Sequence, residues 1–381
     1  MIKLLKSVND FWNHLWHKVH NEELPGGNSS LLVANNVSTP DESIDLKCIK
    51  PINTETIQGE NEYNTEGENN ESSNDTLPNS CCDFIRQQTY MNSSDTIILG
   101  ASLRGKSHIE SNTDCQDYHL YQELSNGWNI LVVSDGAGSA KYAGRGSKAN
   151  CTISIKLLSE MIAKNKWIEN SILPSELDWH IEFRTICERM KQIYQNKVEE
   201  MNDGSVLTDF NATLLICVIT PNGMLSGHIG DGRMGYYSVN GEWKNLMIPH
   251  KGEEGNQTLF LQSSWNKPHV PALKVSNVYV PETRVIRDIP KAVVLISDGC
   301  ERSCWECSIF DTNIGKYTDV NSPHPGFMEP LIESIIAEED SNRFNLFVDI
   351  IDKGTKACQT ERDDKTMLIV MSKINHGISN I

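Results

Sequence analysis

The sequence lacks any apolar run of the roughly 18–20 residues that a membrane helix needs. It also lacks a secretory signal, since no uninterrupted apolar stretch of roughly 7–15 residues stands near the N-terminus. Cations are scarce: 51 Asp and Glu outnumber 34 Lys and Arg among 381 residues, which gives a formal charge of −17. Nucleic-acid and anionic-membrane binding both need clustered cations. We therefore expect a cytoplasmic protein without a membrane span or a nucleic-acid partner.

The cysteines lack the pattern of a disulfide framework. There are 11 of them, an odd number at irregular spacing, so we expect reduced thiols. Cys300, Cys304 and Cys307 form one local cluster that could bind a metal, sense redox state or be incidental. A tetrahedral zinc site needs four ligands, and no second Cys-x-x-Cys pair completes this one. The incidental interpretation is therefore favoured.

The chain divides into three predicted parts. Residues 1–27 carry apolar side chains at three- and four-residue spacing, which predicts an amphipathic helix. That helix could pack on its own domain, dock on a partner or lie on a membrane surface, and a weakly basic polar face disfavours the last. Residues 28–95 are rich in Asn, Glu, Ser and Thr, which predicts a disordered acidic linker. Residues 96–376 are predicted to form a globular domain.

The globular part alternates β-rich apolar runs with helical stretches. Runs such as ILVVSDG, ATLLICVIT and AVVLISDG are bounded by Gly, Asn or Pro, as strands usually are. Helices are expected near residues 144–164, 181–202, 329–337 and 342–356. Hairpin-like pairs indicate antiparallel sheets rather than strict βαβ units. The predicted fold class is α+β, with two sheets covered by helices.

Four aspartates stand where an apolar strand gives way to a turn, namely Asp135, Asp231, Asp298 and Asp363. One such residue is usually a turn former, but four in one domain, three of them followed by Gly, indicate a shared task. Hard divalent cations take oxygen ligands of this kind. Gly136 has no Cβ, so a backbone oxygen could approach a metal closely there.

These segments resemble the metal-dependent type 2C Ser/Thr protein phosphatases, especially their compact bacterial branch. The resemblance covers about residues 98–373, and its elements occur in the family's order. They are GASLRGKSHIESNTDCQDYH, VVSDGAGSAKYAGRGSK, FNATLLICVIT, HIGDGRMGYY, LISDG and RDDKTMLIV. The resemblance implies two packed, mainly antiparallel sheets flanked by helices, in a monomeric catalytic domain. It also implies two or three Mn²⁺ or Mg²⁺ ions and hydrolysis of phosphoserine or phosphothreonine by a metal-bridged hydroxide.

The family's residue roles carry over position by position. Asp135 would bridge two metals, and Gly136 would give its carbonyl to one of them. Asp298 and Asp363 would hold the other metal. Asp231, together with Asp298, would form a third and weaker site. The remaining acids would act beside the ligands: Asp117 would orient metal-bound water, and Asp364 would tune Asp363.

Two departures concern substrate binding and proton transfer. Many members carry a phosphate-gripping Arg where this chain has Asn112, and the nearest candidates to replace it are Arg104, Lys106 and His108. Some members also have a His as general acid where this chain has Ala137. His108 could supply a proton instead, or could be an ordinary structural residue. The long stretch at 249–290 matches a substrate-selecting flap in the family, and could equally be a variable insert.

The resemblance leaves two functions open. The favoured one is an active phosphatase acting on a phosphoprotein, in bacterial signalling opposite a cognate Ser/Thr kinase. The alternative is a pseudophosphatase that binds phosphoproteins or scaffolds a kinase. Cys115 stands two residues before Asp117, where it could be a nucleophile. However, the His-Cys-x5-Arg loop that marks Cys-dependent phosphatases is absent.

Overall fold

The computed structural model describes residues 84–250, 258–263, 274–275, 278–307, 309–311 and 315–373. The predicted N-terminal helix and most of the predicted linker lie outside these residues. One part of the linker prediction is wrong. Residues 85–92 form strand β1 (Ile85–Asn92), which pairs along its length with β2 (Thr96–Leu103). The folded domain therefore begins at least one strand before residue 96.

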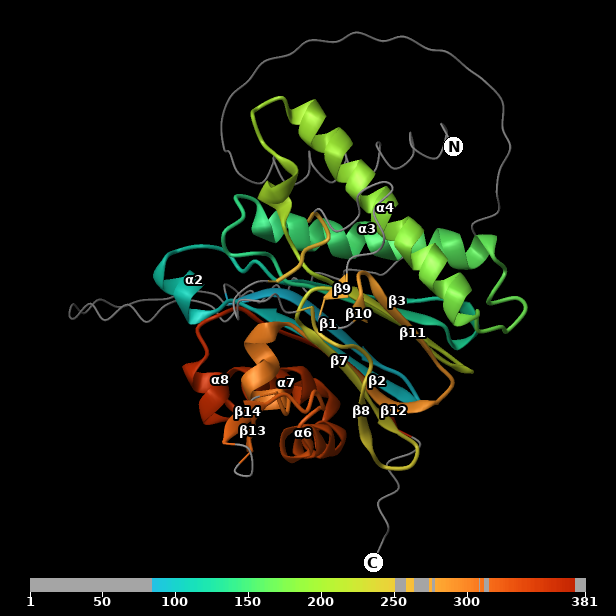
Figure 1. The fold of residues 1–381 in the computed structure, drawn as a ribbon. Coiled ribbons are helices and arrows are strands. Elements are labelled where there is room, and N and C mark those ends of the chain that lie inside the picture. Colours follow the sequence, from blue (N-terminus) through green and yellow to red (C-terminus); the bar gives the residue numbers. More distant parts are fainter. Residues whose placement is uncertain are drawn as a thin grey trace, which may run out of the picture.

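Two antiparallel sheets form the centre of the domain (Figure 1). The six-stranded sheet has the order β1-β2-β15-β12-β7-β8, and the five-stranded sheet has the order β11-β6-β5-β4-β3. The remaining strands of the first sheet are β15 (Lys365–Ser372), β12 (Pro290–Ile296), β7 (Arg233–Ser238) and β8 (Trp243–Asn245). Those of the second are β11 (Glu282–Ile286), β6 (Gly223–Ile229), β5 (Leu214–Thr220), β4 (Asn129–Ser134) and β3 (Tyr118–Glu123). Two short ribbons pair β9 (Lys274–Val275) with β10 (Val278–Tyr279) and β13 (Ile309–Asp311) with β14 (Lys316–Thr318).

Helices cover the outer face of each sheet, as Figure 1 shows. The long helices α3 (Ala143–Lys164) and α4 (Glu176–Met201) lie over the five-stranded sheet, whereas α6 (Pro325–Ala337) and α7 (Asp340–Lys353) cover the six-stranded one. Short helices α2 (Lys106–Glu110), α5 (Glu301–Cys304) and α8 (Lys356–Thr360) lie in the connections. The predicted α+β class with two packed antiparallel sheets is confirmed. None of the described helices is long and apolar enough to cross a bilayer.

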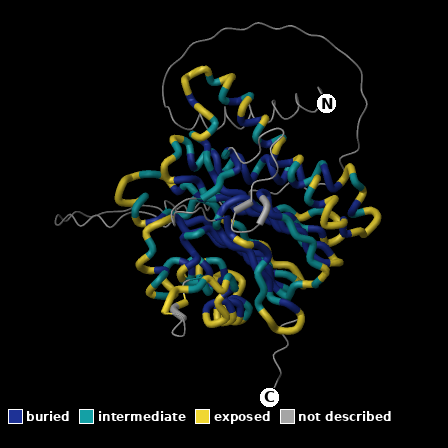
Figure 2. The backbone as a smooth tube through the Cα atoms, in the orientation of Figure 1, coloured by how far each residue is buried: buried dark blue, intermediate teal, exposed yellow. Residues whose placement is uncertain are grey.

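Successive side chains of each strand point to opposite faces of the sheet, and this alternation explains why the domain has layers. In β4, Ile130 and Val132 pack under the helices, while Leu131 and Val133 pack between the two sheets. An unbroken apolar run therefore fills both layers. Figure 2 shows the consequence: buried residues fill the sheets, and exposed residues lie on loops and on the outer faces of the helices.

A buried histidine joins the sheets near β1. His119 of β3 is fully buried, with its Nδ1 2.9 Å from Ser102 Oγ and its Nε2 3.2 Å from Thr89 Oγ1. Burial lowers its pKa to about 3, so the ring stays neutral. Gly100 leaves room for this ring, because a Cβ there would lie 2.5 Å from His119 Nε2.

We predict that Gly100→Ala destabilises the domain by about 1–3 kcal/mol, since the new methyl group overpacks a filled interior. Thermal unfolding should show a Tm lower by several degrees. Gly138→Ala is the matched control, because the atom nearest to a Cβ there would be Gln116 Oε1 at 4.0 Å. Equal Tm values for the two variants would contradict this packing.

Candidate metal centre

Five aspartates occupy one edge of the paired sheets because of where their strands begin and end. Asp135 follows β4 directly, and Asp117 directly precedes its antiparallel neighbour β3. Asp298 follows β12 after one residue, and Asp363 precedes β15, which is antiparallel to β12. Asp231 lies in the turn between β6 and β7. The end of one antiparallel strand lies beside the start of the next, so the topology gathers all five.

The carboxylates repel one another at this edge. Burial raises the pKa of Asp135 well above its usual range, and the charges of Asp117, Asp298, Asp363 and Asp231 raise it further. Burial followed by the charge of Asp231 likewise raises the pKa of Asp298. Asp135 therefore stands at the centre of the predicted ligand set, within electrostatic reach of every other member.

Hydroxyl groups hold the acids in place. Burial, and then the charge of Asp364, raise the pKa of Asp117 to about 7, and a hydrogen bond from Ser297 opposes that rise. Ser297 Oγ donates to Asp117 Oδ2 at 2.7 Å and accepts from the Thr366 amide at 3.0 Å. Thr258 Oγ1 donates to Asp231 Oδ2. These contacts fix carboxylate orientation without cancelling the negative charge.

The residues present fit a hard divalent cation. Asp298 Oδ1 is buried, with no hydrogen-bond partner, which is costly unless another group binds it. Gly136 lies in a tight cradle, because a Cβ there would lie 2.6 Å from the Ala143 carbonyl oxygen and 2.8 Å from that of Gln116. Carboxylate oxygens are the donors that Mg²⁺ and Mn²⁺ prefer.

Asp364 has a larger structural task than tuning its neighbour. It is almost fully buried, and its Oδ1 accepts from the Gly105 amide at 2.6 Å and lies 2.8 Å from His108 Nδ1. Its Oδ2 accepts from the Gln116 amide at 2.5 Å. One side chain thus joins the start of α2 to the loop that carries Asp117. The sequence signal for it was the consecutive Asp363-Asp364 pair.

Comparison with known proteins shows the family of the chain. The sequence profile of the protein phosphatase 2C family matches residues 104–343, well over half of the chain. The chain belongs to the protein phosphatase 2C family. It is a protein phosphatase, and the resemblance of its motifs to that family is confirmed. The pseudophosphatase alternative is not favoured, because none of the five aspartates is replaced.

Several solved structures are similar to this chain. RsbX in complex with magnesium is 16% identical, with 75% of this chain and 100% of that chain covered and a TM-score of 0.42. PppA of Pseudomonas aeruginosa is 14% identical, with coverage of 73% and 98% and a TM-score of 0.43. PstP/Ppp of Mycobacterium tuberculosis is 14% identical, with coverage of 73% and 98% and a TM-score of 0.41. No match is found among curated proteins.

The basic side chains considered as replacements for the family's phosphate-binding Arg lie in different surroundings. Lys106 is exposed, and its ammonium donates to the Gln359 carbonyl. Arg104 Nη2 donates to the His108 carbonyl at 3.0 Å. Asn112 follows α2 in the left-handed region, with φ 54°, a conformation that Asn adopts more readily than most residues. That turn explains why Asn suits this position better than Arg.

Arg86 was not among the predicted site residues, because its strand lies in the stretch predicted as a linker. Arg86 Nη1 donates to the Cys115 carbonyl, and its Nη2 donates to the Gly144 carbonyl at 2.9 Å. Arg86 therefore ties β1 to the loop before Asp117 and to the first turn of α3. The polar pattern IRQQTYMN gave no apolar run to reveal this strand.

A second group of side chains that could bind a metal lies next to the turn that carries Asp231. Atoms of His228, His250 and Glu282 lie within 4.8 Å of one another, and all three residues are buried. The two rings stack at 4.2 Å, and His228 Nε2 donates to a backbone carbonyl at 3.0 Å. The His250 amide donates to the Gly230 carbonyl at 2.8 Å. We assign this group to supporting the turn that carries Asp231.

In the part of the chain that the structure describes, the cysteines do not form a second candidate metal centre. Its eight cysteines are free, and Cys300 and Cys304 are buried. Burial raises the pKa of the Cys115 thiol well above its usual value, so a thiolate nucleophile is disfavoured there.

We predict that Asp298→Asn stabilises the metal-free protein, since it removes one of several mutually repelling carboxylate charges. Each unit of pKa shift corresponds to about 1.4 kcal/mol, so Tm in chelator should rise by about 2–4 °C. Mn²⁺ should raise the Tm of the parent protein by more than that of the variant, which loses one ligand but keeps Asp135 and Gly136. The control is Asp95→Asn, an exposed residue, and a lower Tm for chelated Asp298→Asn than for this control would contradict the prediction.

Proposed function

We propose that this phosphatase hydrolyses phosphoserine and phosphothreonine on proteins with the help of Mn²⁺ or Mg²⁺. The observation that carries the proposal is the group of mutually repelling aspartates around Asp135, in which Asp117 is buried and Asp135, Asp231 and Asp298 are partly buried. Such a group costs free energy unless cations compensate it. When bound there, divalent cations supply Lewis acidity and activation of water.

The chain's own residues would divide the task. Asp135, Gly136, Asp298 and Asp363 would hold two ions, and Asp231 would contribute to a third. Support comes from the orphaned Asp298 Oδ1 and from the cradle around Gly136. No protein nucleophile is required, and no phosphoenzyme would form.

Asp117 would orient the water that attacks phosphorus. Support comes from its complete burial and from the Ser297 hydrogen bond that fixes one of its oxygens.

His108 would protonate the leaving oxygen. Its Nδ1 lies 2.8 Å from Asp364 Oδ1, which leaves Nε2 as the second ring nitrogen available for proton transfer. A carboxylate that orients an imidazole is a common feature of acid–base sites. His108 is partly exposed, with 15% of its side-chain surface accessible, so a substrate could approach it.

The physiological substrate would be a phosphoprotein, with a Ser/Thr kinase as the opposing enzyme and the cytoplasm as the site of action. We further propose that the domain acts as a monomer. These statements rest on membership of the phosphatase family and on the acidic, cation-poor composition.

Hydrolysis of p-nitrophenyl phosphate and of a phosphothreonine peptide tests the proposed function. We predict that activity requires Mn²⁺ or Mg²⁺, stops in chelator, and falls by at least about 100-fold in Asp135→Asn, because a metal ligand is lost. Asp95→Asn should retain full activity. Equal activity in chelator and in Mn²⁺ would contradict the proposal.

Leaving-group dependence tests His108. We predict that His108→Asn slows the phosphothreonine peptide by about 10²–10⁴-fold, the usual worth of a general acid. The loss with p-nitrophenyl phosphate should be much smaller, because a nitrophenolate leaves without prior protonation. Equal losses with both substrates would indicate that His108 only holds Asp364 in place.

A further inference from the structure

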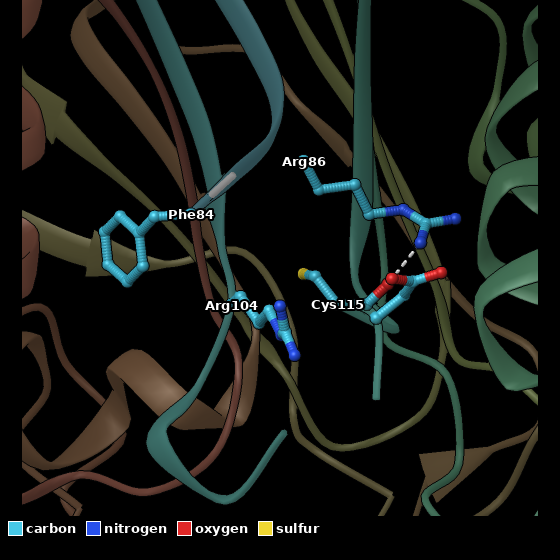
Figure 3. Close-up of a pocket in the computed structure, with 5 residues that line it drawn as sticks. Phe84, Arg86, Arg104 and Cys115 are labelled. Carbon is cyan, nitrogen blue, oxygen red and sulfur yellow. Dashed lines mark hydrogen bonds between the residues drawn. The ribbon is translucent and has the colours of Figure 1, made fainter. Parts of the chain in front are cut away.

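A cavity of about 120 Å³ lies beside the loop that leads to Asp117 (Figure 3). It is lined by Phe84, Arg86, Arg104, Asp114 and Cys115, and we call it the arginine pocket. Liquid water occupies about 30 Å³ per molecule, so the pocket has room for a small polar group. Two of its five lining residues are cations, although the chain as a whole is strongly acidic.

Both guanidinium groups keep an unused donor. Arg86 Nε and Arg104 Nε are buried and have no hydrogen-bond partner. Among the described residues, neither arginine forms an ion pair, and their only hydrogen-bond acceptors are the carbonyls of Cys115, Gly144 and His108. A buried charged donor without an acceptor is costly. Oxyanions are the ligands that guanidinium groups bind best.

The balance of charge selects the kind of oxyanion. Two arginines and the exposed carboxylate of Asp114 give the pocket one net positive charge. One negative charge compensates it, whereas a phosphoryl dianion would leave an excess of negative charge beside Asp114. The pocket therefore fits a carboxylate better than a phosphoryl group.

The pocket adjoins the metal centre through the backbone. Cys115 precedes Asp117 by two residues on one loop, and Gly144, which accepts from Arg86, follows Ala143, whose carbonyl packs against Gly136. An extended peptide advances roughly 3.5 Å per residue. A side chain a few residues from the phosphoresidue could therefore reach the arginine pocket.

We propose that the arginine pocket binds a Glu or Asp side chain of the substrate, near the phosphoserine or phosphothreonine that is hydrolysed. This assignment rests on the proposed function. It gives Arg104 a different task from the one predicted by sequence, since the group it binds is not the reacting phosphate. The phosphatase would accordingly prefer substrates with an acidic residue at a fixed distance from the phosphoresidue.

Kinetics with paired peptides test the proposal on the full chain. Phosphothreonine peptides that carry a single Glu or Gln, moved from four positions before to four after the phosphoresidue, are compared with Mn²⁺ present. At one position or two adjacent positions, Glu should lower KM about tenfold relative to Gln, or about 1.4 kcal/mol. The effect on kcat should be smaller, as for binding that is equal in ground and transition states.

Variants that should weaken the preference for Glu are compared with a variant that should strengthen it. The ratio of KM for the Gln peptide to KM for the Glu peptide should fall from about ten towards one in Arg104→Gln. It should fall only partly in Arg104→Lys, which keeps the charge but loses the planar fork. Asp114→Asn should raise the ratio, and should also favour a phosphoserine at the same position, because the pocket then carries two positive charges. Thermal unfolding establishes that each variant is folded.

The outcomes separate the pocket from the proposed function. If Glu is no better than Gln at every position, or if the preference persists unchanged in Arg104→Gln, the assignment of the pocket is wrong. A preference for phosphoserine over Glu in the parent protein would overturn the carboxylate assignment. If no peptide is hydrolysed, the proposed function fails, and fluorescence anisotropy of the same Glu and Gln peptides in chelator then decides the pocket by their Kd ratio.

Discussion

Repulsion between neighbouring, largely half-buried carboxylates is the constraint on which this structure depends. Burial and the charges of four other aspartates both raise the pKa of Asp135, so the protein keeps at one edge of its paired sheets a group of side chains that the fold alone does not stabilise. Two well-packed sheets and their covering helices are what hold these side chains together. A binding centre built in this way exchanges stability for affinity towards cations.

Rigid support for that centre comes from residues outside the ligand set. Asp364 holds the backbone of Gly105 and Gln116, and Arg86 holds that of Cys115 and Gly144. These four backbone positions flank the loops that present Asp117 and Gly136. Because hydrogen bonds to charged groups are stronger than neutral ones, a small number of such contacts fixes the loops from both sides.

The strand–Asp–Gly pattern made most of the candidate centre predictable from sequence. An apolar strand followed by Asp and Gly specifies both where the chain turns and where a carboxylate stands, so the sites at Asp135 and Asp298 needed no tertiary information. Strand β1 was missed because its sequence is polar, as an edge strand permits. Arg86 was missed with it, and the partners of Asp364 were missed because they depend on contacts between residues more than 200 positions apart.

The starts of two helices could have been predicted from local sequence, whereas the arginine pocket could not. Helix α4 begins at Glu176, five residues before the predicted start, since Ser175 caps it by accepting from the Asp178 amide at 3.1 Å. That Ser-x-x-Asp signal was local and could have been used. Helix α6 begins at Pro325, a residue suited to the first turn. By contrast, the arginine pocket combines β1 with the loop before Asp117, and only the folded chain brings these together.

Electron paramagnetic resonance of the Mn²⁺-loaded protein tests the central claim most directly, since it reports whether one carboxylate joins two ions. The account predicts two Mn²⁺ ions per chain with a spin-coupled spectrum, and loss of that coupling in Asp135→Asn. A spectrum of isolated Mn²⁺ ions in the parent protein, or an unchanged coupled spectrum in Asp135→Asn, would contradict the placement of Asp135 between two metals.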